Sequence, residues 1–275
     1  MQTKAGAVIE VVIVFGLTLF LVALVGLSPL GQWESQVTNR VFIEYAVMIA
    51  VPLLILVVAR RNLASYGLSL RNLSYHLGIA GTALVPVLIA IVPLMFVNYT
   101  RWGGALIMAG VEIALLFVLG WLLKRKPTRD ENGILVGGML LIAGSSLTQQ
   151  TAVANAISGF VFYLFFLGLG EELLFRGYIQ SRLNAAWGKQ FKFFGVKWGW
   201  GVVIASVLFG LMHVLNLASL IRGDWQLAWP WGLWTFFGGL TLGLVREKTG
   251  SIVAPTILHG LPQALQAIGL AFLGL

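Results

Sequence analysis

Two adjacent carboxylates, Glu171 and Glu172, follow a long apolar run in this sequence, and Arg176 comes four residues after the second of them. Charged side chains at membrane depth are costly, so by default they indicate a functional site. On a helix the two glutamates point about 100° apart, whereas Glu172 and Arg176 share one face. The spacing therefore predicts that Glu172 pairs with Arg176 and that Glu171 is left free to face something else.

Two histidines lie in apolar runs of the same C-terminal half. His213 is near the end of one run, and His259 is about two turns into the last one. Gln263 and Gln266 follow His259 at four and seven residues, on its own helical face. The third histidine, His76, lies beside an expected membrane boundary, and we interpret it as incidental.

These side chains could perform a definite reaction. A carboxylate shielded from water can act as a general base, and an imidazole can share and orient a water molecule with it. A second imidazole and an amide can donate hydrogen bonds to a developing oxyanion. Together they describe attack of an activated water on a carbonyl, which is amide hydrolysis. The same set, Glu171, His213 and His259, could instead bind Zn²⁺ and leave a position open for water.

Composition sets the class of protein. The chain of 275 residues is 59% hydrophobic and 10% charged, with a mean hydropathy of +0.91. A soluble domain of this size cannot bury so much apolar surface, so the sequence predicts an all-α, polytopic transmembrane helix bundle. Cysteine is absent, which excludes disulfides, thiolate metal sites and a cysteine nucleophile. An H-E-x-x-H motif is also absent, which excludes a thermolysin-like zinc site.

Eight apolar runs have the length to span a bilayer. They cover residues 5–27, 41–59, 77–97, 105–123, 152–170, 201–215, 227–245 and 252–275. A shorter, glycine-rich run at 133–144 is either a ninth span or a buried half-helix. With nine spans and a cytoplasmic N-terminus, fifteen basic residues face the cytoplasm and only Arg40, Arg101 and Arg222 face out. The positive-inside rule therefore favours nine spans over eight. We expect the protein in the cytoplasmic membrane of a prokaryote.

Basic and loop-like segments suggest how the chain is divided. Residues 124–132, KRKPTRDEN, are the most loop-like linker. This linker would separate N-terminal transmembrane helices, residues 1–132, from a C-terminal catalytic core, residues 133–275. The basic and aromatic segment 176–200 is predicted to be an interfacial helix and turn. The net charge of +8 comes from lysines and arginines that set the orientation of the protein in the membrane and contact the lipid bilayer. No nucleic acid is expected as a partner.

Three stretches together resemble the CPBP family of intramembrane proteases. This family includes the Rce1-type CAAX prenyl endopeptidases and bacterial relatives first described as Abi proteins. Its pattern is E-E-x-x-x-R, then F-x-x-x-H, then H-x-x-x-N or -D, on successive membrane helices. Here the three motifs are residues 171–176, 209–213 and 259–263. The resemblance covers roughly residues 159–266.

The resemblance implies an intramembrane endopeptidase, either glutamate-dependent or metal-dependent, that acts on a membrane-anchored protein or peptide. Glu171 takes the place of the glutamate that activates water. His213 takes the place of the histidine that shares this water. Glu172 and Arg176 would brace the site. In the metal-dependent case, Zn²⁺ would be the cofactor.

The resemblance also implies an oxyanion site. His259 matches the histidine proposed to stabilise the oxyanion, and Gln263 occupies the place of its asparagine partner. Gln263 departs from the family pattern because glutamine is one methylene longer than asparagine. Its amide can donate the same hydrogen bond only if the helix sits slightly farther back. Pro262 directly before it can loosen the helix locally and allow this.

A non-enzymatic function is the alternative. The same glutamate and two histidines could relay protons or hold an ion in a transporter or binding bundle. Glu10, Glu44 and Glu112 lie in or at N-terminal spans, as proton pathways require. The plainer interpretation of these three acids is burial with polar partners. The sequence shows no inverted repeat, which weakens the case for a transporter.

Overall fold

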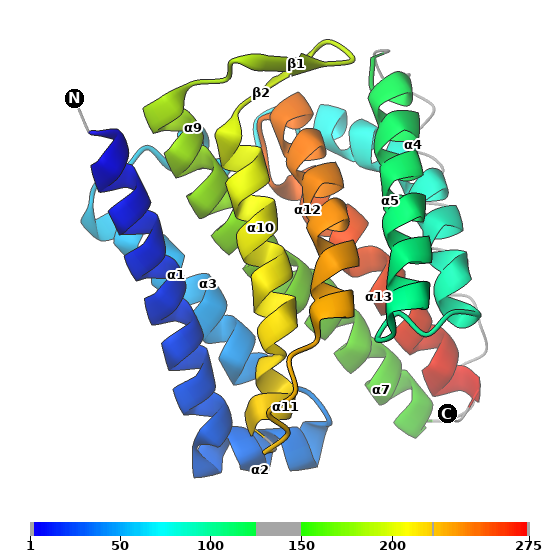
Figure 1. The fold of residues 1–275 in the computed structure, drawn as a ribbon. Helices are drawn as coiled ribbons and strands as arrows, with labels where there is room; N and C mark the ends of the chain where they lie inside the picture. Colours follow the sequence, from blue (N-terminus) through cyan, green and yellow to red (C-terminus); the bar gives the residue numbers. More distant parts are fainter. Residues whose placement is uncertain (1–2, 125–149, 222, 274–275) are drawn as a thin grey trace.

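The computed structural model describes residues 3–124, 150–221 and 223–273. Within these ranges the chain is a bundle of helices with one small β-hairpin at one end (Figure 1). The predicted ninth span at 133–144, and the linker 124–132 apart from Lys124, lie outside the described residues.

The first part of the bundle contains helices α1 (Lys4–Leu27), α2 (Pro29–Thr38), α3 (Phe42–Val58), α4 (Leu73–Ile91) and α5 (Trp102–Leu122), with the 3₁₀ turns η1 (Leu63–Tyr66) and η2 (Val92–Met95). The second part contains α7 (Gln150–Val161), η3 (Phe162–Gly168), α8 (Leu169–Glu172), η4 (Leu173–Gln180), α9 (Ser181–Trp187), β1 (Phe191–Phe193), β2 (Val196–Trp198), α10 (Trp200–Leu215), α11 (Leu217–Ile221), α12 (Trp229–Thr249) and α13 (Val253–Leu273). The segments η3 and η4 are π-helical.

The eight apolar runs of spanning length are all helical, so the predicted class of all-α membrane bundle is confirmed. Five helices of the described residues are long and apolar enough to cross a membrane. They are Lys4–Leu27, Leu73–Met95, Trp102–Leu122, Ala152–Trp187 and Trp200–Ile221. A sixth apolar helix, Phe42–Val58, is shorter. Helices of the two parts pack against each other, α12 on α5 and α13 on α4.

The helix that carries the two glutamates is longer than the sequence predicted. The apolar run ends at residue 170, and an interfacial helix was expected after Arg176. Instead α7, η3, α8, η4 and α9 form one helical stretch, Ala152–Trp187, with Glu171 and Glu172 inside it. The stretch continues through the bundle because its basic residues find buried partners there. Arg182, which is 2% exposed, donates from Nε to Glu10 Oε2 of α1 at 2.8 Å.

The remainder of the predicted interfacial segment is a β-hairpin. β1 and β2 pair antiparallel, with Lys192 opposite Lys197. Phe194 and Gly195 form the two-residue connection, with φ of 44° and 88°. Positive φ at both positions is the geometry of a type I′ turn, which matches the twist of a tight hairpin. Phe193 packs edge-on against Phe117 of α5, with ring centroids 5.5 Å apart.

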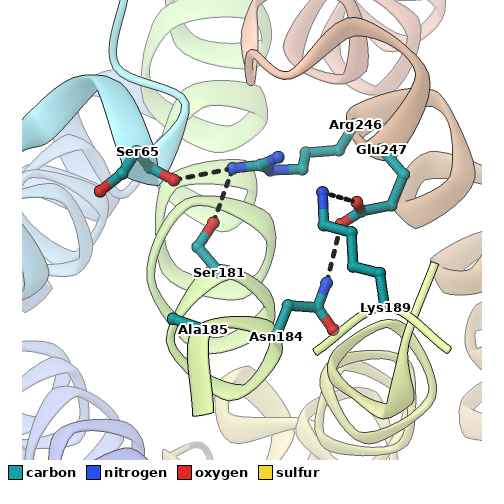
Figure 2. Close-up of a pocket in the computed structure, with 7 residues that line it drawn as sticks. All are labelled: Ser65, Ser181, Asn184, Ala185, Lys189, Arg246 and Glu247. Carbon is teal, nitrogen blue, oxygen red and sulfur yellow. Dashed lines mark hydrogen bonds and ion pairs between the residues drawn. The ribbon is translucent and has the colours of Figure 1, made fainter. Parts of the chain in front are cut away.

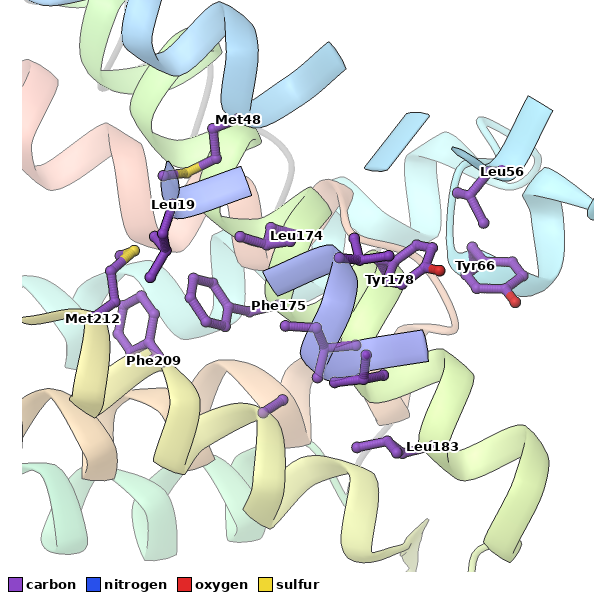
Figure 3. Packing of buried hydrophobic residues seen from close by; sticks show 14 of the residues in the cluster. Leu19, Met48, Leu56, Tyr66, Leu174, Phe175, Tyr178, Leu183, Phe209 and Met212 are labelled. Carbon is purple, nitrogen blue, oxygen red and sulfur yellow. The ribbon is translucent and has the colours of Figure 1, made fainter. Parts of the chain in front are cut away.

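Two clusters of buried apolar side chains hold the bundle together. The first joins α1, α3, α10 and the long helix through residues such as Leu19, Met48, Phe175 and Phe209 (Figure 3). The second joins α4, α5, α12 and α13. Phe175 and Phe209 meet at a centroid distance of 5.1 Å. The long helix thereby lies between elements of both parts of the chain, which is where its polar residues need partners.

The acids of the N-terminal helices differ in how they are held. Glu10 accepts hydrogen bonds from Tyr178 Oη and from Arg182 Nε, both at 2.8 Å, and it also pairs with Arg61. It therefore joins α1 to the long helix through polar partners, which agrees with the plainer of the two interpretations of these acids. Glu112, which is 9% exposed, accepts a long hydrogen bond of 3.4 Å from Thr241 Oγ1 of α12.

Candidate functional site

The two glutamates are buried in the middle of the long helix. Glu171 is 3% exposed and Glu172 is fully buried. Their helical turn, α8, is flanked by the π-helical segments η3 and η4. Such widened turns are rare and often occur at functional sites. The predicted ion pair is present, because Arg176 Nη1 lies 3.0 Å from Glu172 Oε1.

His259 lies between the two glutamates. Its Nδ1 is 2.9 Å from Glu172 Oε1, and its Nε2 is 3.6 Å from Glu171 Oε2. The sequence predicted no contact between His259 and Glu172. In the structure one carboxylate oxygen of Glu172 meets both Arg176 and His259. Glu172 therefore orients the imidazole and directs its other nitrogen toward Glu171.

Two glycines allow α13 to deliver His259 to this position. A Cβ atom at Gly260 would lie 2.4 Å from Tyr163 O, and one at Gly168 would lie 3.0 Å from Thr256 O. A contact of 2.4 Å is not available to a residue with a side chain, and one of 3.0 Å is tighter than most Cβ contacts. The two helices can therefore cross closely only where glycine stands, as is common between membrane helices. His259 directly precedes one of these glycines.

Phe209, the first residue of the F-x-x-x-H motif, is the centre of the site. The Arg176 guanidinium lies over its ring, 4.5 Å from the centroid. The rings of His213 and His259 lie 4.6 Å and 5.8 Å from the same ring. Arg176 is 1% exposed and donates from Nη2 to Gly239 O at 3.2 Å. A cation stacked on an aromatic face in a dry environment gains electrostatic stabilisation.

His213 has a defined tautomer. Its Nδ1 is 2.8 Å from the carbonyl oxygen of Phe209. A carbonyl only accepts, so Nδ1 must carry the proton, and Nε2 of the neutral ring is an acceptor. Across residues 3–124, 150–221 and 223–273, no direct hydrogen bond or ion pair joins His213 to Glu171 or to His259. The structure thus brings Glu171, Glu172, Arg176 and His259 into contact. His213 contacts none of the four directly by a hydrogen bond or ion pair among the described residues, and its ring packs on Phe209.

Residues 153–265 match the family model described as Rce1-like, type II CAAX prenyl endopeptidase. The chain carries an Rce1-like domain. The resemblance seen in the three motifs is thereby confirmed. No curated protein and no solved structure matches the chain. The Rce1-like domain extends from α7 into α13 and contains all the predicted site residues. It indicates a CAAX-type intramembrane protease in general, in an integral membrane protein that acts on a membrane-associated protein.

One polar partner of the site comes from outside the Rce1-like domain and was missed in the sequence. Tyr45 of α3 donates from its hydroxyl to Glu171 Oε1 at 3.0 Å. Tyr45 follows Glu44 in an apolar run, and this pair of polar residues was the available signal. The other carboxylate oxygen, Oε2 of Glu171, has no hydrogen-bond partner in the part of the chain that the structure describes. Tyr45 therefore fixes one oxygen and leaves the other open.

Gln263 lies one turn beyond His259 on α13 and is half-buried. Among the described residues, none forms a hydrogen bond with it. Gln266, one turn further along, is exposed. The amide of Gln263 is therefore less exposed than that of Gln266 and is not engaged by any described residue.

The arrangement does not fit a three-ligand metal site. Within the described ranges, no three His, Cys, Asp or Glu side chains are grouped closely enough to hold a metal ion. His259 has Nδ1 on Glu172 and Nε2 toward Glu171, and His213 has Nδ1 on a backbone carbonyl, which leaves its Nε2 free. A zinc site made of Glu171, His213 and His259 needs nitrogen lone pairs that converge with a carboxylate oxygen. Of these three side chains, only His259 Nε2 and Glu171 Oε2 are brought together among the described residues, 3.6 Å apart.

Tyr45→Phe tests the support of Glu171 from α3. We expect a loss of about 10- to 100-fold in turnover, because one hydrogen bond to a charged group contributes about 1.5–3 kcal/mol. Substrate affinity should be unchanged, since the substitution removes only the hydroxyl, whose hydrogen bond goes to the Glu171 carboxylate. The measurement is a comparison of kcat and KM for wild type and variant. Tyr99→Phe is the matched control, because Tyr99 packs on Trp231 and Trp234 without contacting the glutamates. Equal turnover of both variants would show that Tyr45 does not position the base.

Proposed function

We propose that this protein is an endopeptidase that hydrolyses a peptide bond of a membrane-associated substrate by means of water activated by Glu171. One observation carries the proposal. The free oxygen of Glu171 is buried inside a membrane helix and faces an imidazole nitrogen at 3.6 Å. The neighbouring carboxylate is held by Arg176 and by the other nitrogen of the same imidazole. The two adjacent acids thus have different surroundings and different roles, one as base and one as brace.

The chemistry follows from these roles. Glu171 Oε2 takes a proton from water as the water attacks the carbonyl carbon, and the carbonyl oxygen becomes an oxyanion. His213, with its Nε2 lone pair, holds the same water in place. His259, oriented by Glu172, and the amide of Gln263 donate to the oxyanion. Glu171 then gives its proton to the leaving amine, so that one water is consumed for each bond broken.

The substrate class follows from the position of the site. Because Glu171 and Glu172 lie within a membrane helix, the scissile bond must be brought to membrane depth. A protein or peptide with a lipid or apolar anchor close to the cleaved bond meets this requirement. We propose cleavage near the terminus of such a substrate, as in CAAX-type processing.

Gln263→Ala tests the oxyanion role. We expect a loss on the order of 3 kcal/mol, or about a hundredfold in turnover, because this is what one oxyanion donor typically supplies. KM should change little, since the hydrogen bond is made mainly in the transition state. Gln263→Asn restores the family residue on a backbone suited to the longer side chain, so partial activity is expected. Gln266→Ala is the control on the same face. Wild-type turnover of Gln263→Ala would remove Gln263 from the mechanism.

Metal removal separates the proposed water mechanism from metal catalysis. We expect purified protein to retain full cleavage activity after chelation and dialysis, because no described group of side chains fits a metal. Elemental analysis should find less than about one metal per ten chains, well under the single ion a catalytic site holds. Loss of cleavage on chelation, with recovery on addition of Zn²⁺, would contradict the proposal.

A further inference from the structure

A second polar site lies apart from the glutamates, at the end of the bundle that holds the β-hairpin. A cavity of about 180 Å³ opens there between η1, α9 and α12 (Figure 2). It is lined by Ser65, Ser181, Asn184, Ala185, Lys189, Arg246 and Glu247. Ser181 is ten residues beyond Glu171 on the same helix, a rise on the order of 15 Å at about 1.5 Å per residue. The cavity is therefore separate from the proposed catalytic centre.

Arg246 contributes a buried positive charge to the lining of this cavity. It is 5% exposed, and its Nη2 donates to Ser65 O at 3.2 Å and to Ser181 Oγ at 2.8 Å. Its Nε is buried without a hydrogen-bond partner. In the described part of the chain no carboxylate forms an ion pair with it. A buried guanidinium that lacks a counter-ion is costly, so its surroundings favour an anion.

The adjacent glutamate, Glu247, attracts Arg246 electrostatically but forms no direct ion pair with it among the described residues. Glu247 Oε1 accepts from Gln180 Nε2 at 2.7 Å and from Asn184 Nδ2 at 2.9 Å. Its Oε2 forms an ion pair with Lys189 Nζ. Glu247 is thus satisfied by three donors on the long helix and the loop after it. With two cations and one anion among its lining residues, the cavity keeps a charge of +1.

The hairpin next to the cavity points to the membrane surface. Lys189 lines the cavity and precedes β1 by two residues. Lys192 and Lys197 are exposed and lie directly opposite each other in the hairpin. Like charges in that position repel, and nearby anions would lessen the repulsion. Together with the aromatic residues of the hairpin, this pattern suits the level of anionic lipid headgroups.

We propose that this cavity binds the phosphate group of an anionic phospholipid, with Arg246 as the main ligand and Lys189 at the mouth. A guanidinium presents a planar set of donors that matches phosphate oxygens in a two-point contact. The bound lipid would also stabilise the helix of the glutamates, because Ser181 Oγ accepts from Arg246 and donates to Arg176 O at 3.0 Å. The proposal does not depend on the catalytic mechanism.

Lipid retention by the full-length protein tests the proposal. The protein is placed in nanodiscs of phosphatidylglycerol and phosphatidylcholine in equal parts, released, and analysed by native mass spectrometry. We expect wild type to retain one phosphatidylglycerol. Arg246→Lys keeps the charge but loses the planar donors, and Ala185→Phe fills the cavity from an exposed position. Both should retain about tenfold less lipid, the effect of losing one charged hydrogen bond. Arg101→Gln removes an exposed charge outside both the cavity and the hairpin and should behave as wild type.

A second measurement identifies the source of the phosphate. Inorganic phosphate, with sulfate as a control at equal ionic strength, is added to lipid-free protein in detergent, and the melting temperature is followed. Stabilisation of wild type by inorganic phosphate, without lipid retention, would assign the cavity to free phosphate and overturn the lipid as its source. Equal retention by wild type, Arg246→Lys and Ala185→Phe would overturn the site. Stabilisation by a peptide with a free terminal carboxylate, and by neither phosphate probe, would overturn it in favour of a peptide site.

Discussion

We expect Glu171→Gln to abolish peptide cleavage while expression and stability in detergent stay close to wild type. The amide has the shape of the carboxylate but cannot take a proton from water. Loss of a general base costs about 10²–10⁴-fold in rate, and here the base also holds the attacking water. Stability should survive because Glu171 Oε2 has no donor among the described residues, and Tyr45 can still donate to the amide oxygen. The measurement is turnover in proteoliposomes beside a melting curve of the same preparation.

Glu171→Asp is the matched variant for this prediction. It keeps the carboxylate but withdraws it by one methylene from His259 and Tyr45, so weak activity should remain. Retention of more than about a tenth of wild-type turnover by Glu171→Gln would exclude Glu171 as the base, since a general base contributes at least a hundredfold.

Glu172→Gln should instead lower stability, by about 3–5 kcal/mol, because it leaves a buried cation without its partner. Arg176 is 1% exposed, and its Nη1 lies 3.0 Å from the carboxylate that would be lost. His259 would lose its orienting contact at the same time. Thermal unfolding followed by tryptophan fluorescence measures the effect, and turnover should fall with it.

The double variant Glu172→Gln with Arg176→Gln separates the ion pair from general damage. When both charges are removed, no uncompensated charge remains in the interior. The double variant should therefore be more stable than Glu172→Gln alone. A double-mutant cycle, which also includes Arg176→Gln alone, gives the coupling free energy between the two positions. A Glu172→Gln protein as stable as wild type would show that this ion pair does not brace the helix.

Local patterns of the sequence predicted most of the fold. The apolar runs became helices because residues confined in a membrane must satisfy their backbone internally. The pair of Glu172 and Arg176 followed from a spacing of four residues. The continuation of the long helix to Trp187 could not be seen locally, because it depends on Glu10 of α1 as a partner for Arg182. The hairpin was missed because its only local signal is the Phe194-Gly195 turn.

The sequence predicted which residues form the site, but not how all of them contact one another. The motifs identified Glu171, His213, His259 and Gln263, but the contact of His259 with Glu172 is made only when α13 crosses the long helix at its glycines. Tyr45 lies far away in the chain and outside the matched family segment, so no local spacing relates it to Glu171.

Cleavage of a library of membrane-anchored peptides in proteoliposomes tests the central claim most directly. Metal-free wild-type protein and Glu171→Gln are incubated with the library, and mass spectrometry identifies the new termini. The account predicts that wild type cleaves a subset of peptides close to their anchors, and that Glu171→Gln leaves the same peptides intact. Cleavage of the same bonds by both proteins, or no cleavage by wild type until metal is added, would contradict it.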